Sequence, residues 1–197
     1  MSAPTPARQD HLLAFFRGFL EKPKQVGSII PSSRFMEKRL VRIAEIEKAQ
    51  VVVELGPGTG GTTRALLSRM QPDARLLAVE INSHFVGLLR RTIRDPRLIV
   101  HEGSAAEIGD ALAHHALAAA DVILSGIPFS TMDRHIGLSI LRSVDANLAP
   151  SGRFVAYQFR DRVEDLGRQV LGAPSVSVEL LNVPPMRIYR WNKPAEA

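Results

Sequence analysis

VVVELGPGTGG, residues 51–61, is the stretch that decides the fold. Three consecutive valines are typical of a strand buried on both faces of a parallel sheet, and the glycines that follow end that strand. Residues 62–70 predict a helix that begins just past the glycine turn. Glycine has no Cβ, so a ligand can approach such a turn closely. We therefore expect a small-molecule site at the carboxyl end of a first strand, where open α/β sheets bind their ligands.

Two carboxylates near this turn narrow the choice of ligand. The three glycines Gly56, Gly58 and Gly61 also satisfy the dinucleotide pattern. Glu54, however, would repel an anionic pyrophosphate and attract a cation. Glu80 ends a second apolar run, 24 positions after Gly56, a spacing suited to gripping ribose hydroxyls. The residues therefore favour a nucleoside ligand with cationic groups over NAD, with a purely structural glycine turn as the alternative.

The string Glu54-x-Gly56-x-Gly58-x-Gly60 resembles motif I of the class I S-adenosylmethionine (SAM) methyltransferases. The ammonium and sulfonium groups of SAM suit an acidic lining. The resemblance implies that SAM binds along the ends of the first strands and leaves as S-adenosylhomocysteine. The predicted cofactor residues are Glu54, Gly56, Pro57, Gly58, Thr59, Gly60, Glu80, Ile81, Gly103, Ser104, Ala105 and Ser125.

Composition limits the class of protein. The 197 residues, 45% hydrophobic and 23% charged, suit one soluble domain with a sizeable core. There is no cysteine, which excludes disulfides and thiolate metal sites, and we expect no metal. No apolar run reaches the roughly 20 residues that cross a bilayer and no signal peptide is visible, so we expect a cytoplasmic protein. Of the formal charge of +5, residues 1–40 carry +4, which favours an anionic partner there.

Strands and helices alternate along the chain, as in a parallel α/β sheet. The predicted fold class is α/β, a Rossmann-like seven-stranded, mostly parallel sheet with a C-terminal antiparallel strand. We expect a lid helix at 34–46 capped by Ser32 or Ser33, a helix capped by Ser83, and a turn at 150–152. We divide the chain into residues 1–48, with the N-terminal amphipathic and lid helices, and residues 49–197, the methyltransferase domain, as one structural unit.

An amphipathic helix is predicted from Asp10 onward. Its apolar stripe covers an arc of about 160° at 100° per residue. Basic residues flank it, which is typical of a helix lying in a membrane interface, although the same stripe also suits packing on the chain's own domain. The predicted membrane residues are Leu12, Phe15, Phe16, Phe19 and Leu20.

SGIPF, residues 125–129, follows the fourth strand, where class I methyltransferases keep the loop that faces the transferred methyl group. The loop is similar to that of the adenine N6-methyltransferases, where an Asn or Asp accepts hydrogen bonds from the target amine and an aromatic residue stacks on the base. Pro128 and Phe129 match that pattern, but Gly126 occupies the position of the oxygen-bearing residue. This argues against base methylation, unless Ser125 substitutes.

Over nearly its whole length the chain resembles the bacterial phospholipid N-methyltransferases. The resemblance runs through FFRGFLEKPK at 15–24, the loop at 26–34, motif I, SGIP at 125–128 and NVPPMRIY at 182–189. It implies successive methylation of phosphatidylethanolamine toward phosphatidylcholine by a peripheral enzyme at the inner face of the cell membrane, with an anionic lipid surface as its partner. An rRNA adenine N6-dimethyltransferase-like enzyme is the alternative, although nucleic acid is not the expected partner. A cofactor-binding module without activity is a third interpretation.

Tyr157, at the end of the fifth strand, is the candidate for orienting the amine, with a plain core tyrosine as the alternative. Phe129 and Ser125 complete the set of candidate catalytic residues. Arg187 is the first choice for the lipid phosphate, because a guanidinium can bind phosphate through two hydrogen bonds. Lys22 and Lys24 are alternative phosphate ligands, and a solvated surface charge is the plain alternative for all three. His101, His114 and His115 have a weaker case.

Overall fold

A computed structural model describes residues 33–182 and 184–196. Among these residues, no helix is long and apolar enough to cross a membrane. The N-terminal amphipathic helix stays a prediction because it lies outside them. The predicted residues outside the described part are Leu12, Phe15, Phe16, Phe19, Leu20, Lys22 and Lys24.

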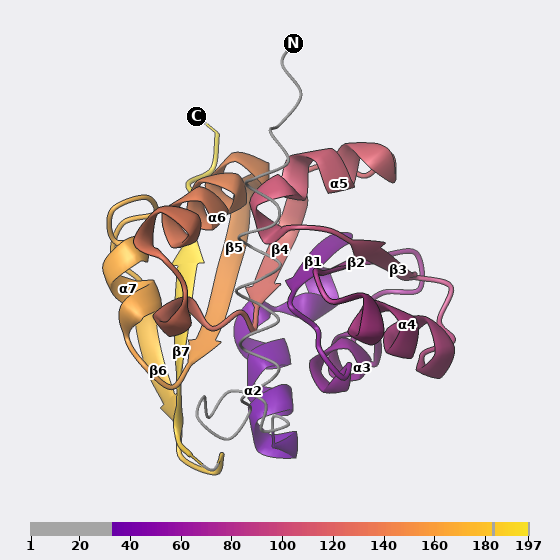
Figure 1. The fold of residues 1–197 in the computed structure, drawn as a ribbon, viewed down its shortest axis with the longest axis horizontal. Helices are drawn as coiled ribbons and strands as arrows, with labels where there is room; N and C mark the ends of the chain where they lie inside the picture. Colours follow the sequence, from indigo (N-terminus) through magenta and orange to yellow (C-terminus); the bar gives the residue numbers. More distant parts are fainter. Residues whose placement is uncertain (1–32, 183, 197) are drawn as a thin grey trace. The chain divides into compact units, whose positions relative to one another are not determined.

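Seven strands form one sheet in the order β3-β2-β1-β4-β5-β7-β6 (Figure 1). They are β1 (Val51–Leu55), β2 (Arg75–Glu80), β3 (Leu98–Glu102), β4 (Ala120–Ser125), β5 (Leu148–Gln158), β6 (Ser175–Glu179) and β7 (Met186–Asn192). The first five pair in parallel, and β7 runs antiparallel to both β5 and β6. The predicted fold class is therefore confirmed. In Figure 1 the arrowheads of β4, β5 and β6 point down, toward what we call the carboxyl edge of the sheet.

Helices connect the strands and cover both faces of the sheet. They are α2 (Arg34–Ala44), α3 (Gly61–Leu67), α4 (Ser83–Thr92), α5 (Ile108–His114), α6 (Arg134–Asn147) and α7 (Arg162–Gly167), with short 3₁₀ helices η1 (Ile46–Lys48), η2 (Ala105–Glu107) and η3 (Phe129–Thr131). Ser33 caps α2, as predicted, by accepting a hydrogen bond from the Met36 N–H. The predicted cap at Ser83 is wrong, because Asn82 accepts from the His84 N–H at 2.8 Å and Ser83 is already helical.

The segment predicted as a lid belongs to the core. α2 buries four residues in one cluster with residues of α3 and of strands β1, β2, β4, β5 and β7. Only its first turn lies near the glycine loop, where a Cβ on Gly61 would meet a Glu37 carboxylate oxygen at 2.8 Å. Lifting α2 off the sheet would expose this apolar surface to water, at a cost of about 25 cal/mol per Å². The buried residues of α2 are Met36, Leu40, Val41 and Ala44. The division of the chain at residue 48 stays a prediction.

The turn predicted at residues 150–152 is also wrong, because these residues lie within β5. The pairing register of β4 with β5 shifts between Ala120 and Val122, and Ser151 adopts a left-handed φ of 59°. The Pro-Ser-Gly sequence is thus accommodated as an irregularity at the start of the strand, where the ladder is interrupted.

Candidate active site

Three loops meet at the carboxyl edge of the sheet. Backbone hydrogen bonds continue the parallel ladders just past the strand ends and hold the loops after β1, β3 and β4 against their neighbours. These bonds, each 3.0 Å long, run from the N–H of Gly56 to the C=O of Val79, from Gly103 to Glu80 and from Gly126 to Leu55. The predicted cofactor loops and the predicted substrate loop are therefore adjacent in space.

The glycine loop after β1 needs glycine for two different reasons. Gly56, Gly58 and Gly60 all have left-handed φ, at 71°, 55° and 83°. A Cβ on Gly60 would lie 2.7 Å from a methyl carbon of Leu89, so this glycine serves packing. A Cβ on Gly58 would meet no atom within 4 Å. The backbone at Gly58 therefore faces open space, which suits the close approach of a cofactor.

Glu80 fastens the glycine loop to the end of β2. Its carboxylate is buried and accepts hydrogen bonds from the N–H groups of Gly58 at 3.1 Å and Asn82 at 2.9 Å. Burial raises the pKa of Glu80, and these backbone hydrogen bonds oppose the rise. The predicted nucleoside-binding carboxylate thus lies beside the loop that it was expected to serve.

Glu54 is 1% exposed beneath the same loop. Burial raises its pKa to about 7, the hydrogen bond from Thr63 opposes the rise, and the charge of Glu80 adds to it. The Thr63 hydroxyl donates to Glu54 Oε2 at 2.7 Å. A cationic group bound nearby would favour the ionised carboxylate. This arrangement fits SAM, whose ammonium and sulfonium are cationic.

Tyr157 reaches the point where the loops after β1 and β4 meet. Its hydroxyl oxygen lies 3.4 Å from the Thr62 hydroxyl. A Cβ built on Gly126 would lie 2.5 Å from the same oxygen and 3.3 Å from the Gly56 carbonyl oxygen. The tyrosine hydroxyl thus fills the space where an Asn or Asp at position 126 would begin its side chain.

The other two candidate catalytic residues are built into the protein interior. Ser125 is fully buried and its hydroxyl accepts from the Ile127 N–H at 3.3 Å. Gln158 donates to the Ile127 carbonyl at 2.6 Å and holds the same loop from β5. The Phe129 ring is fully buried and packs beside Gly137 of α6. Contact of Ser125 or Phe129 with a substrate stays a prediction.

The remaining predicted residues lie around this centre. Ser104 caps η2 by accepting from the Ala106 N–H at 3.2 Å. Arg187 pairs with Gln158 across the β5–β7 ladder, and its guanidinium lies 3.4 Å from Asp161. His101 lies 3.2 Å from His115, ring nitrogen to ring nitrogen, with His114 beside them. No group of side chains in the described residues could hold a metal ion.

Sequence reasoning missed Thr62, Thr63 and Gln158. The threonines follow the glycine loop at the start of α3, on the turn that faces β1, so a polar pair there is a usable signal. Gln158 directly follows Tyr157 at a strand end that enters the site. A polar residue at that place could have been noted.

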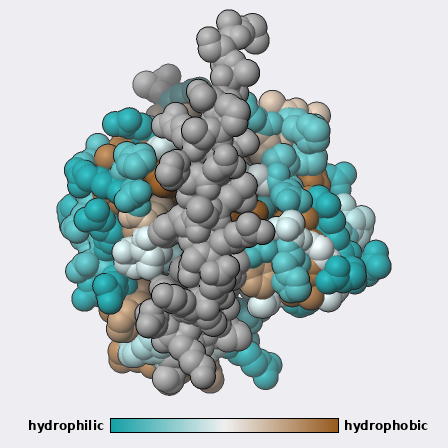
Figure 2. Space-filling view, viewed as in Figure 1, coloured by the Kyte–Doolittle hydropathy of each residue, from teal (hydrophilic) through white to brown (hydrophobic). Residues whose placement is uncertain are grey.

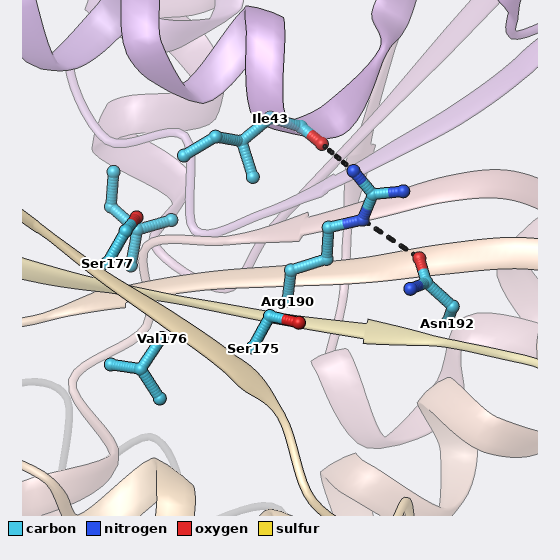
Figure 3. Close-up of a pocket in the computed structure, with 7 residues that line it drawn as sticks. Ile43, Ser175, Val176, Ser177, Arg190 and Asn192 are labelled. Carbon is cyan, nitrogen blue, oxygen red and sulfur yellow. Dashed lines mark hydrogen bonds between the residues drawn. The ribbon is translucent and has the colours of Figure 1, made fainter.

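A separate cavity of about 260 Å³ lies between α2 and the β6–β7 pair (Figure 3). Arg190 crosses it, donating to the Ile43 carbonyl at 3.0 Å and to Asn192 at 2.8 Å. Ser175, at the start of β6, lines it, so the cavity lies toward the edge opposite the site. It shares no residue with the loops described above.

Comparison with known proteins identifies the chemistry. An ornithine lipid N-methyltransferase from Singulisphaera acidiphila is 33% identical over 141 residues, which cover 71% of this chain and 73% of the relative. The chain belongs to the SAM-dependent methyltransferases. The family model of ribosomal RNA adenine dimethylase matches residues 20–106. SAM is therefore the cofactor of this methyltransferase, and the carboxyl edge carries the residues that fit it.

Further relatives share the fold over different lengths. The ribosomal RNA small subunit methyltransferase A of Parasynechococcus marenigrum is 31% identical over 149 residues, 73% of this chain and 48% of the relative. This methyltransferase therefore spans about half the length of that protein. A solved structure of the Burkholderia thailandensis 1,6-didemethyltoxoflavin-N1-methyltransferase with S-adenosylhomocysteine has a TM-score of 0.67 at 17% identity. It covers 98% of this chain, with 93% of its own length matched, and it supports the fold.

Proposed function

We propose that this methyltransferase N-methylates the amine headgroup of a membrane lipid, phosphatidylethanolamine being the expected substrate. The observation that carries the proposal is the Tyr157 hydroxyl over Gly126, 2.5 Å from where a Cβ would lie. An adenine-binding Asn or Asp cannot stand at that position unless Tyr157 moves. The similarity to a relative named as a lipid N-methyltransferase supports a lipid as the substrate class.

For methyl transfer from SAM, the main task of the protein is to position a neutral amine. Bound SAM supplies an activated methyl group. An aliphatic ammonium has a pKa of about 10.4, so it must release a proton to solvent water before its lone pair can react. The Tyr157 hydroxyl accepts a hydrogen bond from the remaining N–H and holds the nitrogen in line, and positioning of this kind supplies much of an enzyme's rate enhancement.

The carboxyl edge also carries a residue that could bind the lipid phosphate at the membrane surface. Arg187 lies on β7 across from Gln158, the residue that follows Tyr157, and its side chain is 47% exposed. Its guanidinium is placed to exchange Asp161 for a phosphate, which accepts two hydrogen bonds from one guanidinium. We accordingly propose that the enzyme works at the inner surface of the cell membrane, with residues 10–22 as a further contact.

Ribosomal RNA is the second candidate substrate. The match of residues 20–106 to the adenine dimethylase family and the rRNA-methylating relatives favour it. The loop after β4 opposes it, since Gly126 carries no side chain to hold an adenine amine.

A direct assay separates the two substrates. The full chain is incubated with methyl-labelled SAM and one of three acceptors: phosphatidylethanolamine vesicles with anionic phosphatidylglycerol, the same vesicles with ornithine lipid, or bacterial ribosomal RNA. We expect label in the phosphatidylethanolamine fraction. Label in ornithine lipid alone would keep the lipid class and correct the headgroup, and label in RNA alone would overturn the proposal.

A further inference from the structure

Large apolar side chains are exposed at the carboxyl edge, beside the site. Leu180 is 73% exposed and Leu181 62%, both in the loop after β6, and Phe159, directly after β5, is 56% exposed. Phe35, in the first turn of α2, is 57% exposed. We call these four residues the apolar rim. Among the described residues the only other large hydrophobic side chains that are exposed are Val176 and Val178 of β6.

The topology places the rim on one edge. β5 and β6 both end at the carboxyl edge because both run antiparallel to β7. One strand separates them, so Phe159 and the leucine loop lie about 10 Å apart. The Ser33 N–H donates to Asn182 at 2.9 Å, which fixes the start of α2 against this loop. Phe35 and Leu181 line the same groove.

Basic residues surround the rim. Arg34 and Lys38 are exposed on α2, Arg160 follows Phe159, and Arg187 is exposed near the start of β7. Carboxylates lie among them as well: Asp161, 3.4 Å from Arg187, is exposed, and Glu37 on α2 is half-buried. Apolar tips between cations are the pattern of a surface that enters the headgroup layer of an anionic membrane, where each Lys or Arg adds to the attraction. RNA would also bind the cations, but it has no apolar interior in which Leu180 and Leu181 could be buried.

Figure 2, in the orientation of Figure 1, shows hydrophobic surface at the lower end of the molecule, where the loop after β6 lies. We propose that the apolar rim seats the carboxyl edge on an anionic lipid surface, with Leu180 and Leu181 among the headgroups and the active site facing the membrane. The inference deepens the proposed function and rests on it. It also explains how a lipid amine reaches Tyr157 without leaving the bilayer, since the loops of the site and the rim share one edge.

The chain has no cysteine, so single cysteines report on single places. Leu181→Cys in the full chain is labelled with an environment-sensitive fluorophore and mixed with vesicles of phosphatidylethanolamine and phosphatidylglycerol at a 2:1 ratio. Val176→Cys is the matched control, because Val176 is exposed on β6 but lies about 10 Å before the end of that strand, away from the carboxyl edge. We expect a blue shift and a two- to threefold gain in emission at position 181 and no change at 176.

Two outcomes would overturn the inference. No spectral change at position 181, or an equal change at both positions, means that the rim stays in water. A change that depends on protein concentration without vesicles means that a second copy of the chain covers the rim. Binding is read without methyl transfer, so a failure of the lipid substrate assignment shows separately in the labelled-SAM assay.

A double variant measures the contribution of the loop. Leu180→Ser with Leu181→Ser should weaken vesicle binding about tenfold or more, since burying a leucine contributes enough for that factor. Methylation of monomeric dihexanoyl phosphatidylethanolamine should stay within twofold of the unaltered chain. Vesicle binding equal to that of the unaltered chain contradicts the inference.

Discussion

The pKa of a carboxylate is raised at one edge of the sheet and lowered at the other. At the carboxyl edge Glu54 has the hydroxyl of Thr63 as partner, and burial raises its pKa to about 7. At the other edge Lys48, Arg153 and Arg190 contact Glu45, and the hydrogen bond from Lys48 leads the lowering of its pKa to about 2.

This difference shows where the fold leaves room for a cation. The charge of Glu45 is balanced by cationic side chains of the protein, so this carboxylate does not need a cationic ligand. Glu54 forms no ion pair with any cation of the described residues. Functional sites commonly hold groups with perturbed pKa values, because a bound ligand provides the opposite charge that the protein itself does not place there. The same edge carries the left-handed glycines of the loop after β1 and the exposed apolar rim.

The strongest way to break the carboxyl edge is Gly126→Asn. The new Cβ would lie 2.5 Å from the Tyr157 hydroxyl and displace it. We expect methyl transfer to lipid to fall by about 100-fold or more, because a misplacement of about 1 Å in a positioning group can cost that much. Gly172→Ala is the matched control, a left-handed glycine with open space around it in a distant turn. Unchanged lipid turnover in Gly126→Asn would refute the role given to Tyr157.

Glu54→Gln tests the difference in carboxylate pKa between the two edges. Because folding raises the pKa of Glu54 from 4.5 to about 7, its stabilising contribution is complete below pH 4.5 and is lost as the pH rises through 7. Urea unfolding of the cofactor-free protein between pH 5 and 9 should show a loss of up to about 3 kcal/mol that Glu54→Gln lacks. SAM should bind more tightly as the pH rises through this range, and equal pH dependence in both proteins would contradict this.

Two glycine variants separate packing from ligand contact. Gly60→Ala places a Cβ 2.7 Å from Leu89 in a left-handed residue, so unfolding free energy should fall by about 2 kcal/mol. Gly58→Ala meets open space and should cost about 1 kcal/mol of stability. It should nevertheless weaken SAM binding about tenfold, because its Cβ stands where a cofactor approaches. Calorimetry of SAM binding decides, and a larger affinity loss in Gly60→Ala would reverse the assignment.

Glu45→Ala should have the smallest effect. Its ion pairs are partly solvated, so we expect a loss of less than about 1 kcal/mol at pH 7. The depressed pKa means that this contribution is present above pH 4.5 and is lost as the pH falls toward 2. SAM affinity should stay unchanged, and a drop in it would show that the two edges are coupled.

The sequence was informative wherever a local pattern fixes a local structure. The valine strand and glycine turn at residues 51–61 predicted β1, the loop and the start of α3, since turn glycines depend on their own backbone angles. The parallel pairing of the first five strands follows from their alternation with helices. The cap at Asn82 was missed because two neighbouring polar residues, Asn82 and Ser83, could each cap the helix. The strand through residues 150–152 was missed because pairing with a neighbouring strand can override a local turn signal.

What depends on contacts between distant segments was out of reach. Phe129 matches a motif, yet its ring is buried against α6. The meeting of Tyr157 with Gly126 joins residues 31 positions apart and requires the β4–β5 register. The burial of Glu54, and with it the raised pKa, depends on the packing of α3.

The most direct test of the central claim is the turnover of Tyr157→Phe on phosphatidylethanolamine vesicles, with SAM affinity measured on the same preparation. The variant keeps the ring and removes the hydroxyl that stands over Gly126. We predict SAM affinity within about twofold of the unaltered chain and turnover lowered by about 100-fold. Unchanged lipid turnover would contradict the account, and an equal loss of both quantities would assign Tyr157 to the fold instead.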